Sequence, residues 1–273
     1  KALIPAPTFA EYGQALASTG CELEYYMLTE NEGFMLGEAY LDILHKGLDM
    51  AFLCNPNNPT GTAIKITDME KILIHCKTKG IRILLVVDEC FLDFVKEPQE
   101  YSLKRSLSGF DNLFILKAFT KRYAMAGVRL GYGLCSNRVL LDKMERNVQP
   151  WNVSTMAQAA GIQALSETEY VEKGRQLIFR ESQWLKEEMT RIGYKVFPSE
   201  ANYIFFKGPE ELFDFCLRKR IVIRDCSNYR GLSKGYFRIA VRTREENDQL
   251  IKIFHDIIRE KQKESGAIYG WRK

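Results

Sequence analysis

Several apolar runs in the first half of this 273-residue chain do not alternate with polar residues, and each stops at a polar turn. The clearest is Ile81–Val87, which ends abruptly in Asp88 and Glu89. Such runs are typical of parallel strands that are covered on both faces and whose carboxyl ends border a ligand-binding crevice. Together with the helical patterns between them, they predict a doubly wound α/β sheet.

Polar side chains stand at the ends of two of these runs. A partly desolvated carboxylate at Asp88 either pairs with a cation or caps the next segment. Asn58 lies in the turn Asn55–Gly61, which two prolines and a glycine make rigid, after the run Met50–Cys54. Its amide either meets a ligand or satisfies local backbone groups. Each feature alone is compatible with a purely structural role.

A lysine follows a third apolar run, Leu113–Leu116. Lysine amines react with carbonyl compounds only where desolvation or nearby cations disfavour their protonation, and most lysines are solvated surface charges. Lys121, however, precedes a small-residue turn that carries Gly127 and Arg129. A glycine there lets the backbone approach an anion. The pattern is compatible with a site where Lys121 meets an anionic carbonyl compound, but taken alone Lys121 is better interpreted as a solvated surface lysine.

In this order and spacing, the three segments closely resemble fold-type I pyridoxal-phosphate enzymes, in the group of histidinol-phosphate aminotransferase and threonine-phosphate decarboxylase. The resemblance spans nearly the whole chain. It implies pyridoxal 5'-phosphate as cofactor, and a doubly wound, mostly parallel sheet followed by a smaller α+β C-terminal domain. It also implies that Lys121 holds the cofactor covalently, that Asp88 pairs with its pyridine nitrogen, and that Asn58 bonds its phenolic oxygen.

The same resemblance assigns further residues. Phe9 matches the aromatic residue that stacks on the cofactor ring, and Thr120 and Arg129 match ligands of its phosphate. Arg238 matches the arginine that binds a substrate anion, and Arg224 is a second candidate for that role. The substrate is then an amino acid or amine that bears a phosphate and reacts through an external aldimine. Family sites draw residues from two subunits, which predicts a homodimer.

Two departures bear on the reaction. Phe91 stands where many aminotransferases have a tyrosine that bonds the phenolic oxygen, and Ala118 lacks a hydroxyl commonly found before the lysine. The segments Pro150–Ser154 and Ile223–Leu232 look more like threonine-phosphate decarboxylase. We therefore favour decarboxylation, with a histidinol-phosphate aminotransferase that passes its amino group to 2-oxoglutarate as the alternative.

The beginning of the chain is already the strand and turn that precede Phe9. Family members have a further segment here that binds the cofactor phosphate. The resemblance thus predicts a large domain over residues 1–165 that is incomplete at its N-terminus, an interdomain helix and small domain over 166–262, and a tail over 263–273. A chain that truly lacked the segment would be a catalytically impaired relative, and this alternative stays open.

Composition narrows the remaining classes. Seven scattered cysteines without Cys-x-x-Cys spacing, and three histidines, favour reduced thiols and argue against a metal site. A net charge of +4 without a basic stripe argues against nucleic acid, and the apolar runs are too short for a membrane span. We expect a cytoplasmic protein. Gly127, Gly131 and Gly133 lack the spacing of a dinucleotide-binding fingerprint, so an oxidoreductase is disfavoured.

Periodicity predicts the other elements. Helices are expected from a cap at Thr67 to about Lys79, from Ser154, and from about Glu167 to Ile192. In the small domain we expect a mixed sheet, with strands Tyr194–Phe197, Asn202–Phe206 and Phe237–Val241 and helices Pro209–Lys219 and Glu245–Lys261.

Overall fold

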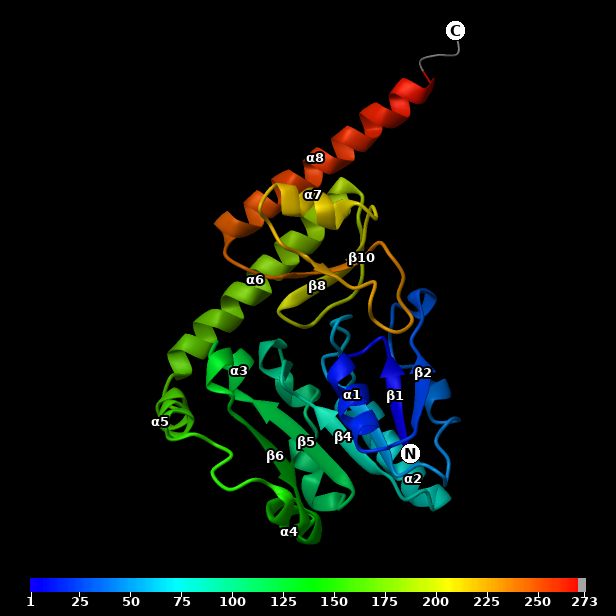
Figure 1. The fold of residues 1–273 in the computed structure, drawn as a ribbon, viewed down its shortest axis with the longest axis vertical. Coiled ribbons are helices and arrows are strands. Elements are labelled where there is room, and N and C mark those ends of the chain that lie inside the picture. Colours follow the sequence, from blue (N-terminus) through cyan, green and yellow to red (C-terminus); the bar gives the residue numbers. More distant parts are fainter. Residues whose placement is uncertain (270–273) are drawn as a thin grey trace.

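The computed structural model describes residues 1–269, with side chains up to residue 260, as two sheets that a long helix connects (Figure 1). The first sheet has six strands in the order β2-β1-β3-β4-β5-β6. These are β1 (Ala2–Ala6), β2 (Leu23–Met27), β3 (Met50–Cys54), β4 (Leu84–Asp88), β5 (Leu113–Ala118) and β6 (Gly131–Cys135). All pair in parallel except β6, which is antiparallel to β5. The predicted doubly wound, mostly parallel sheet is confirmed.

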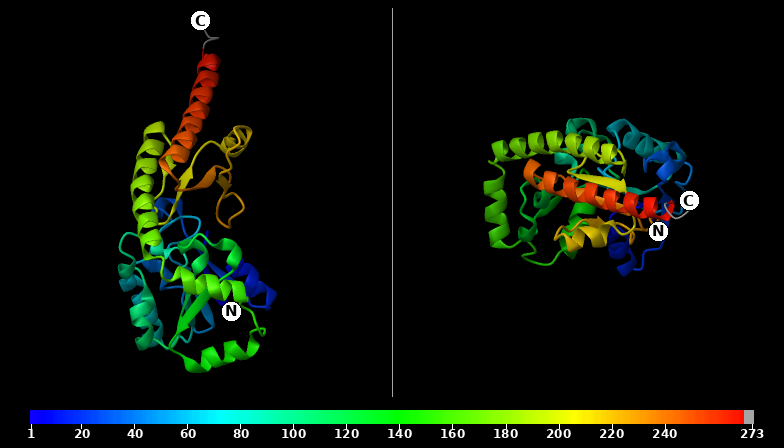
Figure 2. Two further views of the ribbon diagram at one scale, coloured as in Figure 1. Left: turned by 90° about the vertical axis from the view of Figure 1, so that its left-hand side faces the viewer. Right: turned by 90° about the horizontal axis from the view of Figure 1, so that it is seen from above.

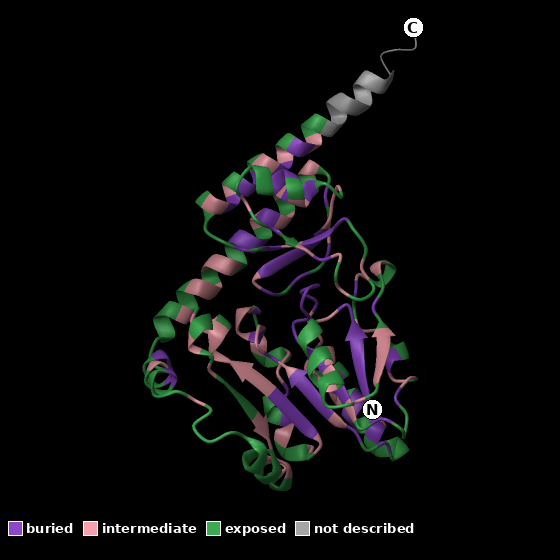
Figure 3. Cartoon of the chain, viewed as in Figure 1, coloured by how far each residue is buried: buried purple, intermediate pink, exposed green. Residues whose placement is uncertain are grey.

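The apolar runs form these strands because helices cover both faces of the sheet. Leu85 and Val87 of β4 are fully buried on the face that α2 (Ile66–Lys79) covers. On the other face, Tyr12 of α1 (Ala10–Ser18) packs against Ile4 and Cys54. Figure 3 shows β1 and much of β4 as buried. The chain order changes direction around β1, so the loops after β1, β3, β4 and β5 meet at one edge of the sheet.

Smaller elements complete this first lobe, as we call the first sheet with its helices. They are α3 (Phe119–Arg122), α4 (Arg138–Asn147), α5 (Thr155–Ala164) and six short 3₁₀ segments, Glu30–Glu32, Glu38–Tyr40, Leu92–Phe94, Pro98–Glu100, Leu103–Gly109 and Ala126–Val128. As predicted, Ser154 caps α5, because its side chain accepts a hydrogen bond from the Ala157 backbone N–H. The cap predicted at Thr67 is wrong. The Lys65 carbonyl already accepts from Asp68 and Met69, so α2 starts one residue before Thr67.

The second sheet has four strands in the order β7-β8-β10-β9, namely β7 (Lys195–Val196), β8 (Tyr203–Lys207), β9 (Arg224–Asp225) and β10 (Tyr236–Ala240). Every neighbouring pair is antiparallel, so the mixed sheet that we expected is wrong. Short connections let consecutive strands pair in opposite directions. One face of this sheet packs on α6 (Thr168–Ile192), α7 (Leu212–Arg218) and α8 (Arg244–Tyr269), which together form the second core.

The helix α6 runs from the first lobe to the second, as Figures 1 and 2 show from different sides. The first lobe also contacts the second sheet directly. Phe34 is buried with Phe197, Phe205 and Tyr236 in a core shared by the two lobes. The carboxylate of Glu30 bonds Lys195, Lys207 and Tyr236.

A second contact between the lobes lies after β3. Gly61 has a φ of 77°, and a Cβ atom there would lie 2.1 Å from Ser199 Oγ. The Glu200 backbone N–H donates a 2.8 Å hydrogen bond to the Gly61 carbonyl. The loop after β3 thus touches the segment that leads into β8, with no space for a side chain between them.

The last helix, α8, continues beyond its expected end at Lys261 and reaches Tyr269. Residues 270–273, which belong to the tail expected from the sequence, lie outside the described residues. The domain division at residue 165 stays a prediction. Within residues 1–269, none of the helices has the length and apolar character that crossing a bilayer requires.

Candidate functional site

The predicted site residues gather where the carboxyl edge of the first sheet faces the second sheet (Figure 1). Phe9 follows β1, Asn58 follows β3, Asp88 ends β4 and Lys121 follows β5. The second sheet adds Arg238 from β10 and Arg224 from β9. The strand order therefore brings residues that are far apart in sequence to one edge of the sheet. Lys121, Arg224 and Arg238 line one cavity there, whereas Phe9, Asn58 and Asp88 are not among its lining residues.

Asp88 is half-buried and accepts two hydrogen bonds from its own lobe. Its Oδ2 accepts from the Tyr12 hydroxyl at 2.6 Å, and its Oδ1 accepts from the Cys90 backbone N–H at 2.9 Å. The second bond matches the capping role that the sequence left open for Asp88. The first was not expected. The two donors together hold the carboxylate in one orientation.

Phe9 stands at the N-terminal cap of α1 and is 39% exposed. Its ring meets the edge of Tyr12, with centroids 5.6 Å apart and ring planes at 81°. Phe9 and Asp88 are therefore linked through one tyrosine. A ring with this exposure has a free face on which a planar ligand can stack.

Asn58 is 7% exposed, and its Oδ1 accepts a hydrogen bond from Arg238 Nη1 of the second lobe. The Tyr229 hydroxyl approaches the same oxygen at 3.4 Å. Since these donors occupy the carbonyl oxygen, the amide group is oriented with its N–H donors directed elsewhere. The surrounding turn is rigid, because the Asn55 side chain bonds the backbone of Ile64 and Tyr101.

Tyr203 of β8 lies between these groups and is buried. Its hydroxyl donates a 2.8 Å hydrogen bond to the Asn57 carbonyl, and the Arg238 guanidinium lies 4.9 Å from its ring centroid. Phe91 meets the Tyr203 ring edge-on at 5.2 Å. Burial raises the pKa of Tyr203 well above its usual value, so its hydroxyl stays a donor. Tyr203 therefore positions the arginine.

Lys121 is exposed and lines a cavity of about 680 Å³ with Phe91, Tyr203, Arg224 and Arg238 among its other residues. Its Nζ lies 5.4 Å from the centroid of the Phe91 ring. Among the described residues, no acid forms an ion pair with Lys121, and no hydrogen bond links it to Asp88. The amine thus lies at a cavity whose lining also includes several arginines, and Glu246, the acid of this lining, is paired with Arg242.

Thr120 and Arg129 have few contacts. Thr120 is half-buried, and Arg129 is exposed with Nη1 bonded to the Ala126 carbonyl at 3.1 Å. Arg129 itself has a positive φ of 56°, whereas a Cβ atom at Gly127 would meet nothing within 4 Å. The space beside Gly127 is therefore open among the described residues, and the left-handed backbone conformation belongs to Arg129.

The cavity carries a surplus of positive charge. Arg224 bonds Asn228 at 3.0 Å and lies opposite Arg238 in the sheet register. Arg242 is paired with Glu246. Arg220 also lines the cavity, with a φ of 63°. Such a lining favours ligands with more than one negative charge.

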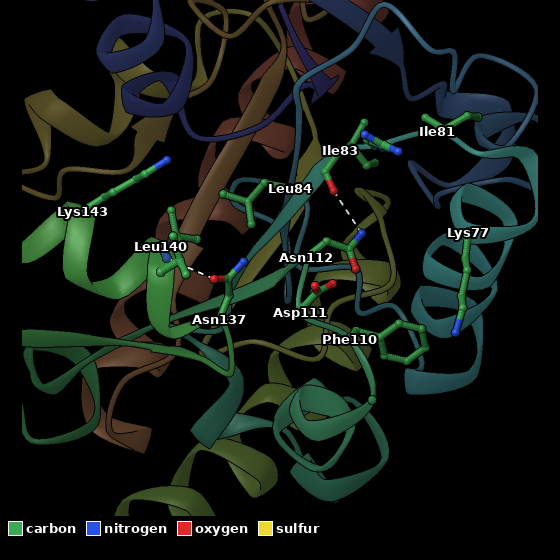
Figure 4. A pocket seen from close by; sticks show the side chains of 13 residues that line it. Lys77, Ile81, Ile83, Leu84, Phe110, Asp111, Asn112, Asn137, Leu140 and Lys143 are labelled. Atoms are coloured by element: carbon green, nitrogen blue, oxygen red, sulfur yellow. Dashed lines mark hydrogen bonds between the residues drawn. The ribbon is translucent and has the colours of Figure 1, made fainter.

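A separate cavity of about 600 Å³ lies at the opposite, amino edge of the first sheet (Figure 4). Leu84 at the start of β4, Asn112 before β5 and Asn137 before α4 line it, and Lys77 and Lys143 stand on opposite sides. It contains none of the predicted site residues. Catalytic groups in this fold gather at the carboxyl edge, so this cavity is not the candidate site.

Sequence reasoning missed three residues of the site, Tyr12, Tyr203 and Arg220. A signal existed for Tyr12, which lies three positions after Phe9, nearly one helical turn further on. Tyr203 directly follows Asn202, the residue at which the sequence predicts that this strand begins. Asn202 lines the cavity, and its Oδ1 is buried without a hydrogen-bond partner among the described residues.

Comparisons with known proteins agree with this geometry. The family described as aminotransferase class I and II matches residues 1–254. Threonine-phosphate decarboxylase of Salmonella typhimurium is 35% identical over 269 residues, which cover 94% of this chain and 71% of the relative. Histidinol-phosphate aminotransferase of Methanococcus maripaludis is 31% identical over 94% of this chain and 69% of the relative. The crystal structure of histidinol-phosphate aminotransferase from Clostridium acetobutylicum superposes with a TM-score of 0.88 at 28% identity, over 95% of this chain and 78% of that one.

Proposed function

The chain belongs to the aminotransferase class I and II family of pyridoxal-phosphate-dependent enzymes, and we propose that it acts on an amino acid or amine that carries a phosphate. Relatives named for decarboxylation and for transamination both cover most of the chain. The enzyme is therefore a decarboxylase or an aminotransferase. We favour the first, a threonine-phosphate decarboxylase-like reaction.

The side chains at the carboxyl edge fit pyridoxal phosphate. Asp88 presents a carboxylate that its own donors hold in one orientation, which suits a protonated pyridine nitrogen. Asn58 has its carbonyl oxygen engaged by Arg238, which leaves its N–H donors for a phenolic oxygen. Phe9 offers an exposed ring face, and Lys121 an amine without an acidic partner. Thr120 and Arg129 are the proposed ligands of the cofactor phosphate.

The observation that carries the substrate assignment is the pair of guanidinium groups in the same cavity as Lys121. Arg224 and Arg238 stand directly opposite each other on adjacent strands, so their Cα atoms are about 5 Å apart. Two arginines at this separation suit a small molecule with two anionic groups. An amino acid phosphate has a carboxylate and a phosphate, which match them.

The division of labour follows from how each arginine is held. Asn58 and the Tyr203 ring hold Arg238 in place. Its guanidinium group is therefore preorganised to bind a carboxylate or phosphate through two N–H donors. Arg224 is exposed, and its guanidinium bonds Asn228 and lies over the Tyr229 ring, so it adjusts more easily to a substrate of a different length. We assign substrate positioning to both.

When bound, the cofactor supplies an electron sink for negative charge at the substrate α carbon. The arginines determine which bond of that carbon is exposed to cleavage, because they fix the carboxylate or release it. If both hold the carboxylate, Lys121 takes the α proton as a general base, which gives transamination. If the phosphate occupies one of them and the carboxylate is turned away, carbon dioxide leaves and Lys121 returns a proton.

A product assay separates the two reactions. The protein is incubated with pyridoxal phosphate and phosphothreonine, and separately with histidinol phosphate plus 2-oxoglutarate. Release of carbon dioxide and aminopropanol phosphate without a keto acid supports decarboxylation. Glutamate formed only in the second mixture contradicts it and supports the aminotransferase alternative. The variants Arg224→Ala and Arg238→Ala should raise KM or lower kcat, whereas Arg82→Ala, outside the site, should leave both unchanged.

We also propose that the chain works as a homodimer. Large apolar side chains are exposed along one stretch of chain through α4 and α5, where a monomer in water would not benefit from them. They are Val139, Met144, Val148, Trp151, Met156, Ile162 and Leu165. The mass in solution, from sedimentation at micromolar concentration, tests this. A monomer at every concentration would contradict it.

A further inference from the structure

Tyr12 is the described side chain that touches both of the groups proposed to hold the pyridine ring. Its hydroxyl is 2.6 Å from Asp88 Oδ2, and its ring meets Phe9 edge-on at 5.6 Å. It is 7% exposed, in the first turn of α1 behind the carboxyl edge. Since it faces the ring partners rather than the cavity with Lys121 and Arg238, it has no part in substrate binding.

The surroundings of Tyr12 fix it in place. Its ring stacks on Phe52 with centroids 5.5 Å apart and planes at 28°, and it packs against Ile4 and Cys54. Burial raises the pKa of Tyr12 well above its usual value, so the hydroxyl remains protonated. An ionised carboxylate only accepts hydrogen bonds, so the proton between the two oxygens belongs to the tyrosine. Tyr12 is therefore a permanent donor to Asp88.

We propose that Tyr12 is a positioning residue for the cofactor, which holds the Asp88 carboxylate and the Phe9 ring in the arrangement that grips the pyridine ring. This rests on the proposed role of Asp88 opposite the ring nitrogen. Asp88 Oδ1 accepts from the Cys90 backbone N–H, and Oδ2 accepts from the Tyr12 hydroxyl. Without the hydroxyl, Oδ2 loses this donor and the carboxylate is free to rotate about its side-chain bond.

The variant Tyr12→Phe tests this, because it keeps the ring contacts with Phe9 and Phe52 and removes only the hydroxyl. Tyr25→Phe is the matched control. Tyr25 packs in the same cluster, and its hydroxyl forms no hydrogen bond within the described part of the chain. Equilibrium titration of the cofactor-free protein with pyridoxal phosphate is the primary measurement. It is followed by kcat and KM for the substrate that the product assay identifies.

We expect Tyr12→Phe to weaken cofactor affinity about tenfold, which is typical of losing a hydrogen bond to a charged group. The value of kcat at saturating cofactor should fall, while KM for substrate stays near that of the wild type. Tyr25→Phe should bind as the wild type does. In an Asp88→Asn background, which binds much more weakly, adding Tyr12→Phe should change affinity little, because the two residues act as one unit.

Two results would overturn the inference. One is wild-type cofactor affinity in Tyr12→Phe, and the other is an undiminished tenfold loss when Asp88→Asn is already present. The second would mean that the hydroxyl acts through packing rather than through the carboxylate. Failure of the proposed function would look different, because the wild-type protein and Tyr25→Phe would then bind no pyridoxal phosphate either.

Discussion

The carboxyl edge of the first sheet has two halves that are built in opposite ways. The covered half consists of β1 to β4 and their loops, in which Asn55, Asn57, Asn58 and Thr60 are buried polar residues with hydrogen-bond partners. The open half consists of β5, β6 and α3 to α5, where Lys121, Arg129 and several large apolar side chains, among them Trp151 and Met156, are exposed. Figure 3 shows the contrast, with purple strands in the covered half and green helices in the open half.

The difference shows how the two halves prepare the site. The covered half is locked against the second lobe through Phe34, Glu30 and Asn58, so its polar groups are preorganised before any ligand arrives. The open half supplies the reactive amine but has few internal contacts to order it. Its final arrangement depends on the cofactor and on the partner subunit that we propose.

The largest effect is expected from the open half. Lys121→Ala should abolish turnover, by about a thousandfold or more, because no other amine lies in the cavity to hold the cofactor or carry a proton. Loss of the visible absorbance of the bound cofactor and of product formation checks this. The control Lys143→Ala removes another lysine of the open half, which lines the separate cavity. It should leave turnover and cofactor absorbance unchanged. Full turnover in Lys121→Ala would refute the assignment of the site.

In the covered half, the contacts of Phe34 and Glu30 with the second lobe should contribute most to the free energy of unfolding. Phe34→Ala should lower the free energy of unfolding by about 3–5 kcal/mol, because it leaves a cavity among Phe197, Phe205 and Tyr236. Urea denaturation followed by circular dichroism measures this. Phe179→Ala, in a residue that is 51% exposed, should change it by about 0.5 kcal/mol or less. Equal effects at both positions would remove the distinction between covered and exposed aromatics.

The contact of Glu30 with the second lobe should weaken in acid. Hydrogen bonds from Lys195, Tyr236 and Lys207 lower the pKa of Glu30 to about 2 from its usual 4.5. A carboxyl with a depressed folded pKa stabilises the fold above the unfolded value, and this is lost as pH falls through the folded value. Glu30→Gln should therefore cost about 1 kcal/mol at pH 7.

The test of this acid dependence is the difference in unfolding free energy between wild type and Glu30→Gln as a function of pH. It should be constant from neutral pH down to about 4.5 and shrink toward zero as pH approaches about 2. Glu210→Gln, at an exposed position, should give a flat difference near zero. A Glu30→Gln difference that does not change with pH would show that the ion pairs do not bridge the lobes in solution.

The smallest stability effect is expected at Trp151 in the open half, which is 95% exposed. Trp151→Ala should change the unfolding free energy of the monomer by about 0.5 kcal/mol or less. If the open half is the face between subunits, however, the same variant should weaken self-association about tenfold or more, as buried aromatic anchors do. Sedimentation equilibrium measures this. An unchanged association constant would place the subunit contact elsewhere.

The covered half was easier to predict from sequence than the open half. Asn58 and Asp88 follow long apolar runs, and a strand that is buried on both faces leaves a strong compositional signal. Lys121 was found through the resemblance of its segment. β6, with Gly131 and Gly133 around an exposed Tyr132, has no such signal, and neither does the two-residue strand β9.

The site residues that we missed share a physical cause. Tyr12 and Tyr203 act through hydroxyl groups whose partners, Asp88 and the Asn57 carbonyl, lie 76 and 146 residues away in sequence. Local patterns cannot register such pairs. Arg220 belongs to a basic run that is typical of a solvated helix end, and only the way the chain turns after α7 brings it to the cavity.

The close approach at Gly61 has a mechanical consequence. Because the backbone at Gly61 presses against Ser199 and is tied to Glu200, the lobes share a fixed point next to the crevice. Since Phe34, Glu30 and Asn58 join the same two lobes at other places, these contacts together oppose both sliding and hinge motion of one lobe relative to the other. A bulkier residue at position 61 would force the two lobes apart beside the crevice.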